Sequence, residues 1–215
     1  MALPKTGYTK TSSENFIIDA ATIFTDFKYD ATGGFTGTPL GATSGGVTVS
    51  IEQTYRKPEV DGAYVMDVVG LQVMESAVAT VTANLKELTA ENLRRSLNGT
   101  IEDAATGEAP KGYKVIKTKR YVEEADYIPS VAVVGIHNGT KQPVIFKLDN
   151  GLVTSPLEVA TEDNNEAVVE QTITAHASYD QLAADEFPWA IYFPGEVQPA
   201  TRMATQDTST KEVSK

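Results

Sequence analysis

Residues 76–88 read SAVATVTANLKEL and contain the most regular alternation in the chain. Small apolar side chains occupy every second position from Ala79 to Leu85, and polar side chains stand between them. A period of two predicts a β-strand with one buried face and one wetted face. The wetted face carries little charge, because its members are Thr80, Thr82, Asn84 and, one step further on, Lys86.

Two neighbouring segments extend this strand into a sheet. Residues 47–55, VTVSIEQTY, alternate in the same way, and residues 64–74, YVMDVVGLQVM, form a further β-rich run. Between them, residues 56–63 contain Pro58 and the pair Asp61-Gly62, which are turn formers. The three runs predict an antiparallel meander with one wetted face.

A short helix follows the meander over residues 90–98. Thr89 is a suitable N-cap, and Leu93 and Leu97 form an apolar stripe at i and i+4. Gly99 suits the position just after the helix, where a left-handed residue is common. We expect this helix to cover one face or end of the sheet.

The remaining β-rich runs complete one antiparallel β domain over residues 1–194, a sandwich or barrel-like sheet with a single short flanking α-helix. Residues 28–46 are Gly-rich and predict a flexible surface loop, and residues 195–215 predict a loose polar tail. Asn138-Gly139 and Asn150-Gly151 predict hairpin turns. The other predicted strands are residues 16–27, 113–122, 130–137, 143–148, 152–159, 167–178 and 189–193.

Composition excludes several classes of function. The chain has 215 residues, a formal net charge of −11 and no cysteine. The absence of cysteine excludes thiol chemistry. The negative net charge argues against sequence-independent binding of nucleic acid, which would need an excess of Lys and Arg. No run approaches the roughly 20 apolar residues that cross a bilayer, and the start lacks an apolar signal region. We expect no association with a membrane. We expect the protein to be made and assembled in a cytoplasm.

No constellation in the sequence predicts catalysis, a metal site or a cofactor. His137 and His176 are the only histidines, and each is interpreted as a structural residue of a strand. No G-x-S-x-G elbow is present. The acidic run 161–167, TEDNNEA, lacks EF-hand spacing and is interpreted as a solvated loop, with weak Ca²⁺ binding as the alternative. The Gly-rich run 33–46 lacks the Gly-Lys-Ser/Thr ending of a phosphate loop.

The order of several short motifs resembles one family. In residues 40–97, Leu-Gly-Ala-Thr and Gly-Gly precede the first long strand, then come Val-Asp-Gly, a Gly-containing strand, and a Thr/Ala/Val strand ending in ELTAENL. A second block contains PSVAVVG at 129–135, Gln-Pro-Val at 142–144 and Asn-Gly-Leu at 150–152. Together these blocks resemble the tail tube (major tail) proteins of long-tailed, non-contractile bacteriophages.

The resemblance implies a subunit that forms hexameric rings, whose sheets join into an inner barrel and whose stacking builds a tube for genome delivery. The chain would then be a virion protein of the tail, assembled in the host bacterial cytoplasm. Its partners would be its own copies, the tail tip, and the tail terminator or tape measure proteins, with DNA passing through the lumen without specific binding. Residues 47–55, 64–74 and 76–88 would form the barrel, with Thr80, Thr82, Asn84 and Lys86 as candidates to face the lumen. The inter-ring loop would consist of Arg56, Lys57, Pro58, Glu59, Val60, Asp61 and Gly62.

Three other functions remain open from the sequence. One is the tube protein of a contractile tail or related secretion system. Another is an adhesin or carbohydrate-binding sandwich that uses Tyr121, Tyr127 and Trp189 as sugar platforms. An enzyme is the third, although no site for one is visible.

Overall fold

A computed structural model describes residues 6–30, 32, 34–62, 66–161, 163 and 166–195. The expected fold class is confirmed: the chain is mainly antiparallel β, with an eight-stranded sheet as its framework. Seven strands follow the order β2-β1-β7-β8-β9-β4-β3, and β10 pairs with β8 beside this path. The sheet strands are β1 (Ile17–Tyr29), β2 (Phe35–Pro39), β3 (Thr43–Arg56), β4 (Val73–Leu85), β7 (Ile128–His137), β8 (Pro143–Val153), β9 (Val169–Thr174) and β10 (Trp189–Tyr192).

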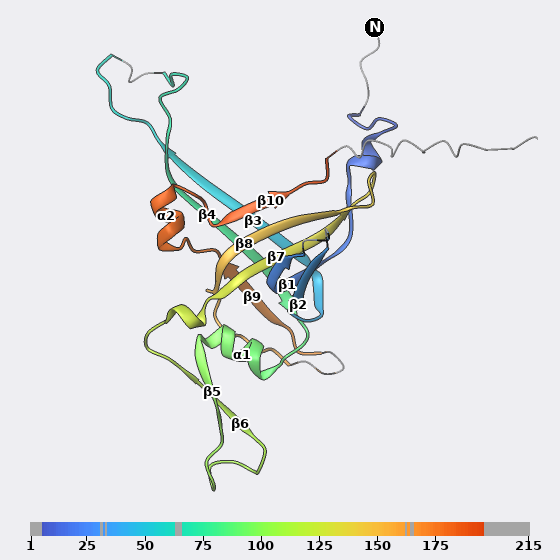
Figure 1. Cartoon of the computed structure of the whole chain (residues 1–215), viewed down its shortest axis with the longest axis vertical. Helices are drawn as coiled ribbons and strands as arrows, with labels where there is room; N and C mark the ends of the chain where they lie inside the picture. The colour runs from blue at the N-terminus through green and yellow to red at the C-terminus, as the bar shows by residue number, and fades with distance from the viewer. Residues whose placement is uncertain are drawn as a thin grey trace, which may run out of the picture.

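The long strand β8 joins two layers of this sheet. Its first part pairs with β7 and β10, and its last residues, Leu152 and Val153, pair with β9. The layer β9-β4-β3 therefore lies against the layer that contains β1 and β7, and the two cross in Figure 1. Their inner faces share one apolar core, which includes Ile23, Val81 and Val131. Burial of this core supplies the main force that holds the layers together.

Helix α1 (Ala90–Leu97) closes one end of the core as expected, and it is fixed there by buried polar side chains. The Thr89 hydroxyl accepts a hydrogen bond from the Asn92 backbone N–H, which confirms the predicted N-cap. The buried Asn92 amide donates to the Leu40 and Glu87 carbonyls at 3.0 and 3.2 Å. Gln171 on β9 donates to the Ser96 hydroxyl at 2.6 Å. Each bond satisfies a buried polar group, so the helix has one favoured position on the sheet.

A buried carboxylate connects α1 to the segment before β7. Asp126 lies in the 3₁₀ turn η2 (Glu124–Asp126) and contacts Lys119 at 2.7 Å and Arg94 of α1 at 3.7 Å. Burial alone would raise the pKa of Asp126, but hydrogen bonds from Lys119 and from the Glu123 backbone outweigh it and lower this pKa below its ordinary value. Asp126 is therefore charged at neutral pH and holds two cations at this end of the domain.

Two hairpins project from opposite ends of the molecule (Figure 1). The first is the outer part of β3 and β4 with the loop that joins them. β9 pairs with only the Thr80–Leu85 part of β4, so residues 52–62 and 66–78 form a two-stranded extension of the sheet, named here the β3–β4 arm. The second is the separate pair β5 (Gly99–Asp103) and β6 (Lys114–Thr118), which follows α1.

The predicted strand over residues 64–74 is wrong for most of its length. Residues 66–72 form turns and irregular backbone, and β4 begins only at Val73. The run is apolar, but no strand of the described chain covers it: Val69 is fully exposed, and Gly70 turns the backbone at φ 87°. An apolar run with no neighbouring strand does not form a strand here, so the described structure has a two-stranded hairpin in place of the expected meander.

The Gly-rich region 28–46 also differs from the predicted loop, because it contains the edge strand β2 and the start of β3. Gly37 of β2 shows why a glycine suits this strand. A Cβ at this position would lie 3.1 Å from the Cβ of Phe24 on the neighbouring β1, so the residue permits a close approach of the two strands.

Other expectations failed at turns and short helices. The Asn138-Gly139 turn is confirmed between β7 and β8, whereas the strand continues through Asn150 and Gly151 as part of β8. The separate strand predicted at 152–159 is therefore wrong beyond Val153. Asn98, rather than Gly99, takes the left-handed conformation after α1, and the short helices α2 (Tyr179–Ala184) and η1 (Ser12–Asn15) were not anticipated. Of the predicted tail 195–215, all but Gly195 lies outside the described residues.

Candidate assembly surfaces

The outer face of β3, β4 and β9 is a continuous field of small polar side chains. Thr80, Thr82 and Asn84 are half-buried and alternate with buried apolar residues of β4, as the sequence predicts. Directly paired residues of neighbouring strands place their side chains on the same face. This surface, named here the polar face, comprises Ser44, Thr48, Ser50, Thr80, Thr82, Asn84, Glu170, Thr172 and Thr174.

Hydroxyl groups on the polar face bond to one another across the strands. Thr82 and Thr172 lie 3.0 Å apart between their side-chain oxygens, and Thr174 makes a similar contact at 2.9 Å with Thr154, which lies just after β8. Further along the β3–β4 arm, Thr54 and Ser76 make a similar contact at 2.6 Å. A ladder of this kind stabilises the strand pairs and leaves the surface polar without adding cations.

Lys86 is the one cation that the sequence assigns to this face, and it is neutralised. It lies just beyond the end of β4, and its ammonium group contacts the Glu166 carboxylate at 3.0 Å. The hydrogen bond from Lys86 lowers the pKa of Glu166, which is therefore ionised at neutral pH. Since Glu170 adds a negative charge, the described part of this surface presents hydroxyls and carboxylates and no unpaired cation.

The polar face ends at an unpaired strand edge. β3 is the last strand of the sheet, and within the described residues its outer edge has no strand partner. β2 ends the sheet at the other side. An open edge exposes a row of backbone N–H and C=O groups that readily pair with another chain.

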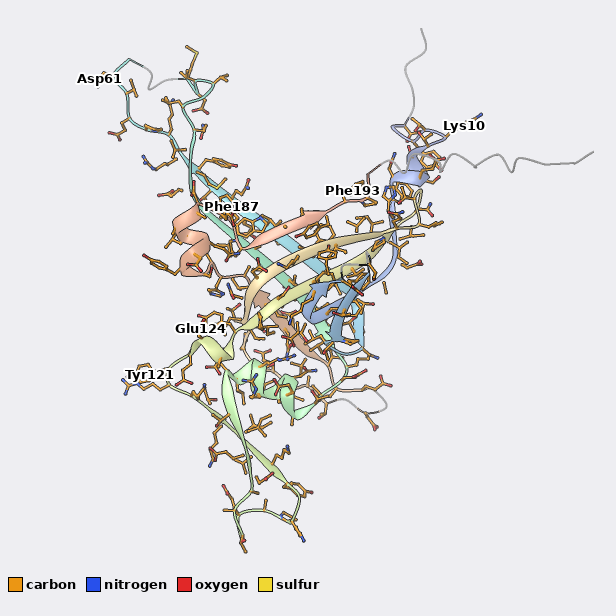
Figure 2. All side chains as sticks on the ribbon, in the orientation of Figure 1. Lys10, Asp61, Tyr121, Glu124, Phe187 and Phe193 are labelled. Atoms are coloured by element: carbon orange, nitrogen blue, oxygen red, sulfur yellow. The ribbon has the colours of Figure 1, made fainter. Side chains whose placement is uncertain are left out.

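The predicted inter-ring residues lie at the β3–β4 arm. Arg56 is the last residue of β3, and Lys57 to Gly62 belong to the joining loop, where Asp61 lies far from the sheet (Figure 2). Lys57 braces the loop by donating to the Met66 carbonyl at 2.6 Å and by contacting Asp67 at 3.4 Å.

The arm also carries several exposed apolar side chains. Its exposed large apolar side chains are Tyr55, Val60, Met66, Val68, Val69, Val73 and Val78. Large exposed apolar patches are uncommon on monomeric soluble proteins, so the arm is a candidate surface for contact with another protein.

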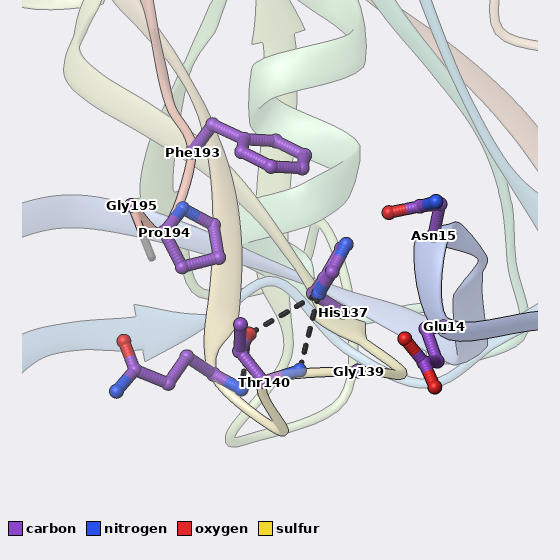
Figure 3. Close-up of a pocket in the computed structure, with 9 residues that line it drawn as sticks. Glu14, Asn15, His137, Gly139, Thr140, Phe193, Pro194 and Gly195 are labelled. Carbon is purple, nitrogen blue, oxygen red and sulfur yellow. Dashed lines mark hydrogen bonds between the residues drawn. The ribbon is translucent and has the colours of Figure 1, made fainter. Parts of the chain in front are cut away.

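The pocket around His137 offers no catalytic arrangement in the described residues. It has a volume of about 690 Å³ and lies between η1, the β7–β8 turn and the residues after β10 (Figure 3). The Thr140 backbone N–H donates to the His137 Nδ1 at 3.3 Å, and the ring packs edge-on against Phe193. His137 thus holds the turn together. His176 packs against Tyr127 in the same manner at a ring distance of 5.2 Å.

The three aromatic residues considered for sugar binding do not form a platform. Tyr121 is exposed, with Arg120 above its ring at 5.3 Å. Tyr127 and Trp189 are half-buried, and Trp189 packs against the core. A stacking platform needs flat exposed rings side by side, so this geometry does not favour the adhesin alternative.

No group of three or more His, Asp or Glu side chains in the described part of the chain could hold a metal ion. None of the helices there has the length and apolarity needed to span a bilayer.

No model of a known protein family and no curated protein matches the chain. Among solved structures, a chain of the virion of a native gene transfer agent (GTA) particle is 14% identical, with coverage of 80% of this chain and 95% of that chain and a TM-score of 0.38. A chain of the six-fold symmetrised anti-feeding prophage (AFP) baseplate is 9% identical, with coverage of 89% and 97% and a TM-score of 0.39. A chain of an extracellular contractile injection system, the PVC sheath–tube complex in its extended state, is 12% identical, with coverage of 87% and 99% and a TM-score of 0.41.

Proposed function

We propose that this chain is the tube subunit of a non-contractile bacteriophage tail. Copies pair through their sheet edges into rings, six per ring by family resemblance, and rings stack into a hollow tube that conducts the genome at infection. The subunit is then a virion protein that assembles in the host cytoplasm. Its further contacts are with the tail tip and with the terminator or tape measure proteins.

One observation carries the proposal: the polar face ends at the edge of β3, which has no strand partner in the described part of the chain. A neighbouring copy that pairs with this edge continues the polar face into the next subunit, and repetition around an axis closes the edges. Closure converts a row of unmatched backbone groups into a hydrogen-bonded barrel. Rings that stack head to tail do not close on themselves, so their stacking gives an open tube.

The chemistry of the polar face suits the wall of a DNA channel. Binding to the DNA backbone depends on Lys and Arg that replace counterions at the phosphates. Thr80, Thr82 and Asn84 offer none, and Lys86 is held by Glu166. The net charge of −11 per chain adds repulsion between the wall and the polyanion. DNA would therefore slide past the wall without adhering to it.

Electron microscopy of the purified protein at rising concentration tests the assembly. Hollow tubes or stacked rings are expected, and a monomer that persists at all concentrations, even with tail-tip initiators, would refute the proposal. Tubes recovered from virions without a surrounding sheath would support a non-contractile tail. Tubes inside a sheath would assign the chain to a contractile one.

Single cysteines test which surface lines the channel, because the native chain contains none. Thr82→Cys is expected to react with a large polymer-linked maleimide in free subunits and to become protected when tubes form. A small maleimide should label it in both states. Equal labelling by the large reagent before and after assembly would place the polar face outside the tube.

A further inference from the structure

The β5–β6 hairpin packs against α1 and contributes no residue to either apolar cluster of the described core. It forms its own two-stranded sheet, and among the described strands it pairs with no other. Most of its residues are exposed, including Tyr113 at 61%. A two-stranded hairpin alone is marginally stable in water, so a surface that receives it would stabilise it.

The hairpin and the residues after it are basic in a strongly acidic chain. Residues 99–120 contain five basic and three acidic side chains, a net charge of +2 against −11 for the whole chain. Lys117 and Lys119 are paired with carboxylates nearby. Lys111 and Lys114 are exposed and have no ion pair in the described structure. These two cations are available to a partner of opposite charge.

The other half of the molecule contains a groove with complementary chemistry. It lies between α2 and the base of the β3–β4 arm, with a volume of about 320 Å³. Ala77, Leu182 and Phe187 give it an apolar wall, and the acidic residues Asp185 and Glu186 also line it. Leu182 is 73% exposed and Phe187 is 50% exposed, so the described chain leaves this wall open.

We propose that the β5–β6 hairpin of one copy docks in the α2 groove of the next copy. The hairpin and the groove lie in opposite halves of the molecule along its longest axis (Figure 1), so the contact repeats head to tail and does not close on itself. The Tyr113 ring fills the apolar part of the groove, and Lys111 and Lys114 face Asp185 and Glu186. The inference rests on the proposed tube, in which this contact joins successive rings alongside the β3–β4 arm.

Charge reversal on each side of the contact tests the pairing. Lys114→Glu is expected to raise the protein concentration needed for tubes about tenfold at low salt, and Glu186→Lys is expected to do the same. The chain that carries both reversals should assemble near the wild-type concentration, because the pair is restored with its signs exchanged. Tyr113→Ala should weaken assembly in a way that salt does not change.

Lys10→Glu is the matched control, since it makes the same charge change at an exposed lysine on the N-terminal segment (Figure 2). Circular dichroism and thermal melts check that all variants fold. If Lys114→Glu and Tyr113→Ala assemble like Lys10→Glu while the wild type forms tubes, the docking contact is overturned and the tube proposal stands. If the wild type itself forms no tubes, both are overturned.

Discussion

Deletion of residues 56–62 should separate folding of the subunit from its assembly. The deleted residues lie at the end of β3 and in the loop of the β3–β4 arm, and none belongs to either apolar cluster of the core. Strand β3 ends at Arg56 and strand β4 begins at Val73. After the deletion, residues 63–72 remain between the two strands and are enough to join them. Hairpins commonly close with loops of only about two to five residues.

The expected change in stability is small and follows from the few interactions that these residues make with the rest of the chain. The deletion removes the terminal ladder pair Arg56–Val73 and the Lys57 hydrogen bond to Met66, each worth about 1 kcal/mol, and the partly exposed ion pair of Lys57 with Asp67, worth about 0.2–1 kcal/mol. Shortening the loop returns roughly 0.4 kcal/mol of closure entropy. The net loss of about 2 kcal/mol would lower the Tm of a chain of this size by about 4–8 °C.

Thermal melts and electron microscopy of the same sample measure the two consequences. We expect a folded subunit that forms no tubes, because the arm no longer reaches the next ring. A second variant, in which a Gly/Ser segment of equal length replaces residues 56–62, should also fail, since it keeps the reach and loses the side chains. Normal tubes from the deletion would refute the role of the loop, and loss of cooperative unfolding would show that the arm belongs to the core.

Three further predictions concern the frame that carries these surfaces. Asn92→Ala should lower the free energy of unfolding in urea by about 2–4 kcal/mol, because two carbonyls lose a buried donor; an unchanged midpoint would contradict the role of Asn92 in fixing α1. Asp126→Asn should destabilise the subunit at neutral pH. The folded pKa of Asp126 lies below its ordinary value of about 3.9, so the loss of unfolding free energy relative to the wild type should be complete above that pH. The loss should vanish as the pH falls through the folded pKa, and a loss that persists in acid would exclude the charge as its cause. Gly99→Ala would place a Cβ 2.2 Å from the Lys117 carbonyl oxygen, so unfolding should become easier by about 1–3 kcal/mol and the amide signals of the β5–β6 hairpin should shift; unperturbed spectra would show that the hairpin yields freely.

The sequence predicted most accurately what depends on local alternation. Parity along residues 79–85 is a property of one strand, and it correctly assigned Thr80, Thr82 and Asn84 to the wetted side. The cap at Thr89 depends on one side chain and one turn, and it was also correct. That these side chains line a channel remains a proposal.

Features that depend on distant pairing could not be found in this way. The polar face needs β9 beside β4, and the contact between Thr82 and Thr172 joins residues 90 positions apart. Residues 66–72 are as apolar as a strand, but the described chain provides no neighbour to pair with them. The α2 groove was missed because α2 has only six residues, too few for a helical period to be visible in the sequence.

Cryo-electron microscopy of assembled material tests the central claim most directly. The account predicts hollow tubes whose channel wall is formed by β3, β4 and β9 of every subunit, with Thr80, Thr82 and Asn84 facing the lumen and β3 paired with a neighbouring copy. A tube lined mainly by basic side chains would contradict it, as would a particle in which β3 remains unpaired and the polar face lies outside.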